Sequence, residues 1–460
     1  MKRAALSLLV LAGCSSMAPK YERPVAPIPP VLPTTTAPAT SEAQLSLGDF
    51  VRDPKLRAVI VQALAQNRDL RVAALSIESA RQRYRIQRAA ALPAIDAGVS
   101  VTSARSIVGP DNATAQSTLY SAQVGMAAWE IDLFGRLKSL SNAREQQFLS
   151  TVENAKATRI SLVGELCTAY VALAADQSRL AIARDTADLA KKTMELTDLL
   201  VSGGTSNRGD FFQASTVYQT ARADVALLTA AIAQDRNALE LLAGGPIAPE
   251  LLPAALPAQL DWFADVPVGL SSAVLLERPD VLAAEHDLMA ANANIGEARA
   301  RFFPSITLTA SGGLASLTLA ALFTGPAGPA AVFALAPAIA VPLFRGGANK
   351  ANLASTKAQK ELFVATYERS IQVAFREVSD ALAVRGTIEE QLAAQVALVE
   401  ASVKAVELAQ GRYKGGIDPF LTTLISQRAL YGAKNSLVST QLAALVSRVT
   451  LYRVLGGGLR

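Results

Sequence analysis

Two long runs without proline restrict the possible folds of this chain more than any other feature of its sequence. No proline occurs from Asp111 to Gly245 or from Leu343 to Asp418. Because proline interrupts a helix, these runs permit helices of about 65 residues, which would be about 100 Å long. Helices of that length form coiled coils or tunnels rather than globular cores. An aromatic content of only 5% agrees with an extended helical molecule.

The two halves of the chain resemble each other at a nearly fixed offset of about 210 residues, which indicates an internal repeat. The matched pairs are Asn67-Arg68-Asp69-Leu70 with Arg278-Pro279-Asp280-Val281, Ala91-Leu92-Pro93 with Phe302-Phe303-Pro304, Leu133-Phe134-Gly135-Arg136 with Leu343-Phe344-Arg345-Gly346, and Gly203-Gly204 with Gly415-Gly416. The pattern predicts in each half a short helix, two strands, a long helix, a glycine turn and a returning helix.

Alternation of apolar and polar residues predicts strands after Pro93 and Pro304. The apolar series are Ile95, Ala97, Val99 and Val101 in the first half and Ile306, Leu308 and Ala310 in the second. Their expected partners are Tyr120–Trp129 and Phe333–Leu343. Strands of about 10 residues cross a bilayer when they are tilted. Four strands cannot close a barrel, and open edges in lipid leave backbone groups unpaired. Three copies of the chain would supply twelve strands.

The stretch from Phe302 to Phe344 contains no charged side chain, so it could also be read as one or two membrane helices. Four prolines oppose that interpretation because they would break a helix there. They are Pro326, Pro329, Pro337 and Pro342. A strand, a long loop and a strand are expected instead. Pro337 and Pro342 then require edge or bulge positions.

The N-terminus has the layout of a signal peptide. Met1-Lys2-Arg3 is positive, Ala4 to Val10 is apolar, and Leu11-Ala12-Gly13 places small residues before Cys14. This arrangement resembles a lipobox, in which the Cys14 thiol becomes linked to diacylglycerol. The residue after the cysteine is Ser15 rather than Asp, which favours sorting to the outer membrane.

Proline-rich segments complete the division of the chain. Prolines between Met17 and Ser46 predict an extended tether whose backbone pairs in neither helix nor ladder. We expect a signal peptide at 1–13, a lipidated proline-rich tether at 14–49, a first structural repeat at 50–245, an inter-repeat linker at 246–270 and a second structural repeat at 271–460.

Few residues are available for catalysis or for metal binding. With Cys14 lipidated, Cys167 is the one remaining thiol, and its apolar helical surroundings favour a core position. His286 is the one histidine and is expected on a helix surface or satisfied by a neighbour. One histidine and one free cysteine are too few to form a catalytic triad or a zinc site of the usual kinds. We therefore expect neither an enzyme nor a metal site, and no cofactor beyond the covalent lipid.

A basic cluster could indicate a nucleic-acid partner, since the net charge is +5. Its members are Arg81, Arg83, Arg85 and Arg88. Three of them share one helix face immediately before the strand at Pro93, where anionic lipid headgroups are expected. No nucleic-acid partner is predicted.

The lipobox, the doubled layout and the paired turns resemble the TolC-type outer-membrane factors, in the lipoprotein branch that includes OprM and NodT. The resemblance covers about Phe50 to Leu455. Its most specific motifs are Trp129-Glu130-Ile131-Asp132-Leu133-Phe134-Gly135, Arg278-Pro279-Asp280 and the stretch from Tyr413 to Gln427. It implies an α+β membrane protein: a trimeric twelve-stranded β-barrel in the outer membrane of a Gram-negative bacterium, continuous with a periplasmic α-helical barrel and an equatorial linker. It also implies a periplasmic adaptor and an inner-membrane pump as partners.

By the same resemblance, the glycine turns lie where the tunnel narrows and adaptor tips dock. Gly203, Gly204, Gly415 and Gly416 would supply the positive φ of a helix C-cap. Asp210 and Asp418 are each expected to cap the returning helix, to line a gate, or both. Phe420 and Leu421 are further gate candidates, and Arg412 is the candidate partner of Asp418. The turn from Gly203 to Asp210 is longer than its second-half counterpart, which contains Pro419, so the two tips are expected to differ.

Three functions from different classes explain parts of this pattern. An outer-membrane duct for efflux accounts for the lipobox, the repeat, the strands and the turns together. The same channel fold would also serve type I protein secretion or metal export. A periplasmic coiled-coil scaffold lipoprotein accounts for the helices but not for the alternating strands. A lipid-anchored hydrolase lacks a nucleophile and base.

Overall fold

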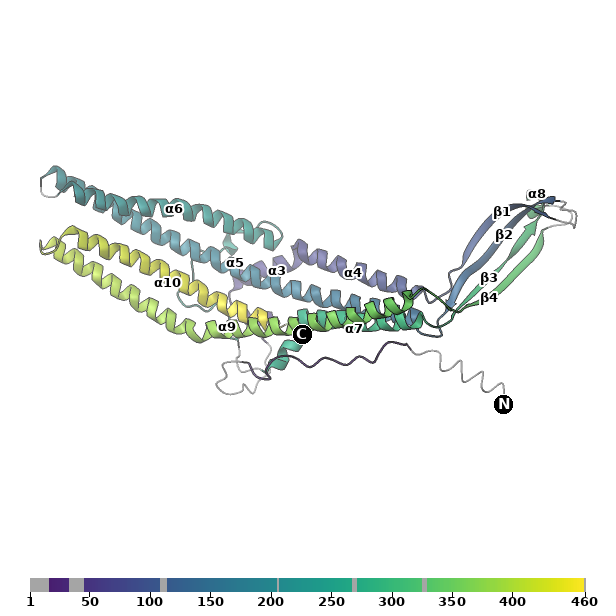
Figure 1. Ribbon diagram of the computed structural model, residues 1–460. Coiled ribbons are helices and arrows are strands. Elements are labelled where there is room, and N and C mark those ends of the chain that lie inside the picture. The colour runs from purple at the N-terminus through teal and green to yellow at the C-terminus, as the bar shows by residue number, and fades with distance from the viewer. Residues whose placement is uncertain are drawn as a thin grey trace. The chain divides into compact units, whose positions relative to one another are not determined.

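The computed structural model describes residues 16–32, 45–107, 114–204, 207–266, 271–324 and 329–458 (Figure 1). The predicted signal peptide and Cys14 lie outside the described residues. The chain divides into two compact units. The first comprises Met1–Val25, Ser76–Val152 and Ala283–Glu368, and the second comprises Ala26–Leu75, Glu153–Leu282 and Arg369–Arg460.

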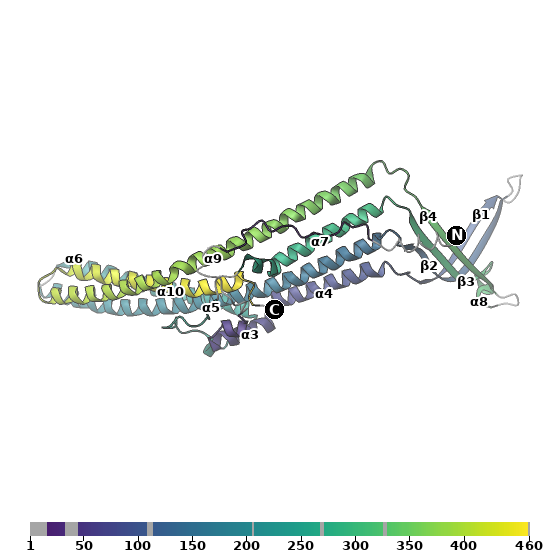
Figure 2. The same cartoon turned by 90° about the horizontal axis from the view of Figure 1, so that it is seen from below.

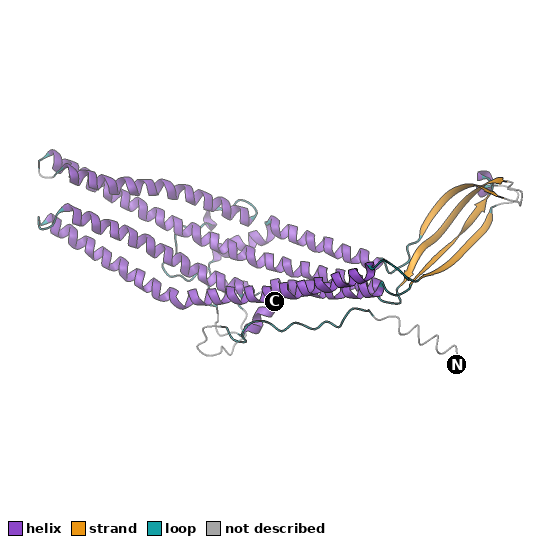
Figure 3. Ribbon diagram, viewed as in Figure 1, coloured by secondary structure: helices purple, strands orange, loops and turns teal. Residues whose placement is uncertain are grey.

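Helices make up most of the described chain (Figure 3). They are α2 (Leu47–Phe50), α3 (Pro54–Gln66), α4 (Arg68–Ala89), α5 (Arg136–Ser202), α6 (Arg208–Ala243), α7 (Pro279–Ala300), α8 (Leu319–Phe323), α9 (Ala348–Lys414) and α10 (Phe420–Val454), with short 3-10 helices at Pro249–Leu251 and Ser272–Glu277.

Both proline-free runs form the long helices that the sequence predicts. α5 and α9 each contain 67 residues, and each is followed by a returning helix, α6 or α10. Among the described residues, α5 has one stretch that could cross a membrane by length and composition, but 56% of it is buried inside the protein. Such burial is what a helix packed against other helices requires.

The four strands form one antiparallel sheet in the order β1-β2-β3-β4. They are β1 (Asp96–Ile107), β2 (Thr114–Ile131), β3 (Ser305–Ser316) and β4 (Ala330–Ala340). All of them lie in the first unit, and β1 and β4 are its two open edges. The register shifts between Met126 and Trp129, where Ala128 has a φ of +49°. This bulge inserts one additional residue into β2 relative to its neighbour β3.

The strands differ from the predicted ones at their ends. β2 begins at Thr114 rather than Tyr120, because the polar residues before Tyr120 pair with β1 even though they lack apolar alternation. β4 ends at Ala340, two residues before Pro342, whose nitrogen carries no hydrogen for the ladder. Pro337 lies within β4 opposite Leu308, at the edge of the sheet as predicted. The segment between β3 and β4 is not simply a loop, since it contains α8, whose first turn Thr318 caps.

One face of the sheet is apolar and exposed. The register places Val99, Val124, Leu314 and Phe333 on this face. Val99 is 68% exposed and Phe333 is 90% exposed. On the opposite face, the hydroxyls of Ser100 and Ser121 are 2.8 Å apart in a hydrogen bond. A water-soluble sheet would bury such an apolar face, whereas a barrel in a bilayer turns it to the lipid.

The predicted tether and linker are more ordered than expected. Val31 pairs with Ser271 in an isolated antiparallel bridge, so the expectation of a backbone without ladder pairing is wrong at that residue. Helix begins at Leu47, inside the predicted tether. In the second unit the linker contributes Phe263, which is fully buried and stacks on Phe50 with ring centroids 5.2 Å apart. The linker is therefore part of a hydrophobic core.

Candidate gate at the helical turns

The two turns that join the long helices to the returning helices both lie in the second unit (Figures 1 and 2). The second glycine of each pair takes the predicted left-handed conformation, with φ of +73° at Gly204 and +67° at Gly416. After α9, the amide of Gly416 donates to the carbonyl of Tyr413 at 3.0 Å, and Ile417 donates to Arg412 at 2.9 Å. These two bonds form a Schellman motif, which satisfies carbonyls at the end of α9.

The predicted helix caps are wrong for both aspartates. Asn207 caps α6, since its side chain accepts a hydrogen bond from the amide of Asp210 at 3.0 Å. Asp210 instead lies in the first turn of α6, where its charge still suits the helix dipole. At α10 the cap position is Pro419, with no side-chain cap bond, and Asp418 lies one residue further out.

The structure brings Arg412 and Asp418 together, as the sequence suggested. The Nε of Arg412 donates to Oδ2 of Asp418 at 2.6 Å, and Nη2 donates to Oδ1 at 2.9 Å. These bonds from the Arg412 guanidinium lower the pKa of the Asp418 carboxyl. The pair closes the turn between α9 and α10, with the Arg412 side chain 53% exposed and that of Asp418 23% exposed.

Phe420 and Leu421 have different surroundings although they are adjacent. Phe420 is 6% exposed and belongs to a hydrophobic cluster with Ala190 of α5 and Val217 of α6. Its ring lies 5.1 Å from that of Tyr413. Leu421 is 47% exposed. In this conformation Phe420 fixes the start of α10 to α5 and α6. Leu421 and Ile417, which is 65% exposed, are the apolar side chains of this turn that are available to a pore.

Two contacts between α10 and α6 were not foreseen from the sequence. The hydroxyl of Tyr431 donates to Oδ2 of Asp224 at 2.7 Å, and Nη2 of Arg428 donates to Thr216 at 2.5 Å. Burial, with a contribution from Asp224, raises the pKa of Tyr431 to about 12. Tyr431 and Arg428 continue the face of α10 that starts at Phe420, and this helical spacing is the signal that could have found them.

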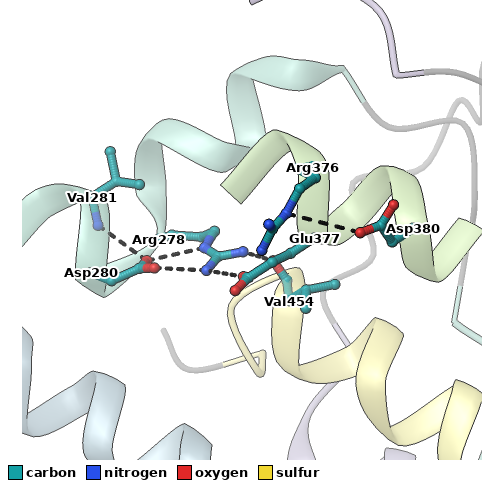
Figure 4. A network of polar contacts seen from close by, with 7 residues as sticks. All are labelled: Arg278, Asp280, Val281, Arg376, Glu377, Asp380 and Val454. Atoms are coloured by element: carbon teal, nitrogen blue, oxygen red, sulfur yellow. Dashed lines mark hydrogen bonds and ion pairs between the residues drawn. The ribbon is translucent and has the colours of Figure 1, made fainter. Parts of the chain in front are cut away.

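The Arg-Pro-Asp motif has a structural role in the second unit (Figure 4). Arg278 is 8% exposed and donates through Nη1 to the carbonyl of Val454 at 2.8 Å, at the end of α10. Its Nη2 contacts Asp280 at 2.7 Å and Glu377 of α9 at 2.8 Å. In the first half, Asn67 stands at the matching place and donates to the carbonyl of Leu242 near the end of α6 at 2.9 Å. Each repeat therefore ties its short helix to the end of its returning helix.

Cys167 and His286, the residues considered for catalysis or metal binding, both have structural surroundings. Cys167 is buried, and burial raises the pKa of its thiol to about 12, so the core position is as predicted. Nδ1 of His286 lies 2.7 Å from Oε1 of Gln146, so the histidine is satisfied by a neighbour. Among the described residues no group of histidines, cysteines and carboxylates could hold a metal ion.

Comparisons with known proteins agree with this geometry. The family described as outer membrane efflux protein matches residues 59–245 and 270–457. The solvent efflux pump outer membrane protein SrpC of Pseudomonas putida is 43% identical, over 98% of this chain and 97% of that protein. The outer membrane protein OprJ of Pseudomonas aeruginosa is 37% identical, over 99% and 95%.

Solved structures show the same fold. A membrane protein from Pseudomonas aeruginosa matches with a TM-score of 0.89 and 36% identity, over 96% of this chain and 98% of that chain. The open state of the MtrE outer membrane channel of Neisseria gonorrhoeae matches with a TM-score of 0.85 and 36% identity, over 97% and 99%. The chain therefore belongs to the outer membrane efflux protein family, with the α+β fold of the trimeric TolC-type channels.

Proposed function

We propose that three copies of this chain form the outer-membrane duct of a tripartite efflux system, which receives its cargo from an inner-membrane pump through a periplasmic adaptor. The observation that carries the proposal is the sheet, with one exposed apolar face and two open edges. Pairing β4 of one copy with β1 of the next removes every edge after three copies, because twelve strands make a closed barrel.

Detergent extraction tests this assembly. The purified protein should be a detergent-dependent trimer by native mass measurement. A stable monomer in aqueous buffer would contradict the barrel and favour the scaffold alternative.

Small apolar molecules are the proposed cargo. The relatives named for solvent, toluene and antibiotic efflux support this choice, at 41% to 43% identity. A host lacking the chain should become more sensitive to toluene, and the gene should restore tolerance only when the pump and adaptor are also present. Unchanged tolerance together with loss of a secreted polypeptide would favour the protein-secretion duct.

A lipid on Cys14 is proposed to anchor each copy, as the one covalent group the protein carries. The motivation is the sequence Leu11-Ala12-Gly13-Cys14. Cys14→Ala should abolish incorporation of radiolabelled palmitate, because it removes the thiol that forms the thioether. Barrel burial is the larger hydrophobic contribution, so the variant should still assemble. Labelling that persists in the variant would rule out Cys14 as the attachment site.

The turn between α9 and α10 is proposed as the gate, closed at rest. Asp418, Arg412 and Leu421 would stand near the constriction with Asp210 of the other turn, and Phe420 would hold the turn in place. Opening would be a shift between packed helices, stabilised when adaptor tips bind the open state better than the closed one. The exposed ion pair and the exposed Leu421 support this assignment.

A further inference from the structure

The sheet carries few charged side chains, and one of them is unpaired. Within the four described strands they are Asp96 and Arg105 of β1 and Glu130 of β2. The Nε of Arg105 donates to the hydroxyl of Thr114 at 2.9 Å, and Glu130 binds the guanidinium of Arg136 at 2.5 Å. The side chain of Asp96 is exposed and has no hydrogen bond or ion pair with any described residue. Asp96 is the first residue of β1, one of the two open edges.

A cavity of about 420 Å³ where the strands meet the helices contains a cation without a partner. The charged residues that line it are Glu130, Asp132, Arg136, Arg301 and Arg345, all in the first unit. Arg136 binds Glu130, and Asp132 accepts hydrogen bonds from two amides at the start of α5. Arg301 binds Glu297, which leaves Arg345, whose exposed side chain has no hydrogen bond or ion pair with any described residue.

The cavity and Asp96 lie on the same face of the sheet, the one opposite to the apolar face. Successive residues of a strand alternate between the two faces. Ala340 of β4 is an odd number of residues from Phe333, and Asp96 is an odd number from Val99, so both point away from the apolar face. Ala340 and its partner in the ladder, Ser305, line the cavity. In a closed barrel this face lines the lumen.

The internal repeat predicts which residues meet when two copies join. The offset of the repeat is 210 residues from Leu133 to Leu343 and 211 residues from Pro93 to Pro304. Within one chain, Glu130 of β2 pairs with Thr307 of β3. Applying the two offsets to that pair places Ala340 of β4 opposite Asp96 of β1 in the neighbouring copy. The strand ends agree, because Ala340 is the last residue of β4 and Asp96 is the first of β1.

We propose that Arg345 binds Asp96 of the neighbouring copy, so that each seam between copies is closed by an ion pair at the luminal base of the barrel. The inference rests on the proposed trimer and names the charges by which one copy recognises the next. Side chains directly opposite each other on paired strands are about 5 Å apart. Asp96 therefore stands beside Ala340, in the cavity that Arg345 also lines. The unpaired carboxylate of one edge meets the unpaired guanidinium beside the other.

This ion pair favours the joining of β4 to β1 over the other ways in which open edges can meet. Two β1 edges would share a seam with two carboxylates and no counterion, and two β4 edges would leave both arginines unpaired. Charges placed at strand edges discriminate against wrong partners in this way. Because β4 and β1 are different edges, the correct contact is head to tail, and such contacts form rings when the rotation closes.

Two complementary charge reversals test the pair in a mixed assembly. Chains with Arg345→Asp and chains with Asp96→Arg, each with its own tag, are produced together, and the trimers are counted by native mass measurement in detergent. Every seam of a homotrimer then joins like charges, whereas a mixed trimer has one such seam. If a like-charged seam lowers assembly about threefold, as for an exposed pair, homotrimers should fall about tenfold below the share of about one quarter that random mixing gives.

Controls separate the ion pair from a general effect of charge. Lys350→Asp makes the same charge change at the start of α9, where Lys350 is exposed but does not line the cavity. Chains with Lys350→Asp should mix at random with tagged parent chains. Arg345→Asp and Asp96→Arg combined in one chain should restore homotrimers to the parental yield, because opposite charges again meet at every seam. Misfolding caused by either single change would not be repaired by adding the other.

The outcomes distinguish the ion pair from the trimer itself. Random mixing of the two reversed variants, with homotrimers at their statistical share, would overturn the ion pair and leave the trimer in place. Failure of the combined exchange to restore homotrimers would also overturn it. A parent chain that forms no trimer in detergent would overturn the proposed assembly instead. Depletion of homotrimers together with their recovery in the combined exchange is the result expected.

Discussion

At the residue scale, Arg412 and Asp418 join the last turn of α9 to the residue before α10 by two charge-assisted hydrogen bonds. Because both side chains are partly exposed, solvent screens the pair, and its contribution to global stability is small. In the proposed gate, threefold repetition would put three such carboxylates, each paired with an Arg412, around one axis. A ring of that kind favours cations in a pore.

Asp418→Ala should raise single-channel conductance in planar bilayers and weaken cation preference. The substitution removes both the tie across the turn and a negative charge from each copy. Asp265→Ala is the matched control, because it removes a carboxylate of the same unit that lies away from the turns, beside Arg448. If the conductance and selectivity of Asp418→Ala equal those of the parent, the constriction lies elsewhere on the turns.

The same pair predicts a pH dependence. Hydrogen bonding to Arg412 lowers the pKa of Asp418, so the pair is fully present above the ordinary pKa of aspartate and is lost as the pH falls through the lowered value. We expect constant conductance from about pH 8 to about pH 5 and an increase only below about pH 4. Asp418→Asn should lack that acid increase. A transition near neutral pH would assign the opening to another group.

At the scale of the element, one face of α10 fixes the tip. Phe420 and Leu424 pack on α5 and α6, and Arg428 and Tyr431 continue the same face with hydrogen bonds to α6. Of these four residues, the two apolar ones lie nearest the turn and the two that form hydrogen bonds lie further along the helix. Movement of α10 during opening would have to exchange all of them.

Phe420→Ala should loosen the tip. The cavity left in the cluster should cost about 3–5 kcal/mol of local stability, whereas Leu421→Ala on the exposed side should cost about 1 kcal/mol or less. Hydrogen–deuterium exchange of the segment around Tyr413 and Phe420 measures the difference. Equal exchange in the two variants would mean that the cluster does not hold the turn.

At the scale of the whole molecule, the internal repeat predicts how copies meet. Within one chain, the turn after β2 places Phe134 on Phe303, which precedes β3, with ring centroids 4.9 Å apart. The matching residues are Phe344, after β4, and Leu92, before β1, and they are 88% and 68% exposed. Since β4 of one copy pairs with β1 of the next in the closed barrel, Phe344 should pack on Leu92 of the neighbouring copy.

Phe344→Cys combined with Leu92→Cys should therefore give disulfide-linked trimers under oxidation. Phe333→Cys with Leu92→Cys is the control, because Phe333 lies on the lipid-facing side of the sheet. It should give no linked species. Monomers alone from the first pair would mean that the two seams of the barrel are not equivalent.

Local periodicity explains what could be predicted from the sequence. The strand after Pro304 could be predicted from the alternation of apolar and polar residues, and the two long helices from the absence of proline, because both patterns are local in the sequence. The helix caps could not be predicted in this way, because Asn207 and Asp210 are both residue types that cap helices. The extended backbone at Asn207 is what makes it the cap of α6, and the sequence does not show that conformation. The ion pair between Arg23 and Glu285 joins residues 262 positions apart and leaves no periodic signal in the sequence.

The two glycine turns also bear on how such a channel evolves. A duplicated gene begins with two identical tips, and here the tips have diverged: one has an asparagine cap, and the other has a proline and an ion pair. Under the proposed function, such divergence would let selection on opening act on one tip and selection on partner contact act on the other. Insertions and substitutions should consequently be tolerated more readily at Gly203–Asp210 than at Arg412–Phe420 among natural variants.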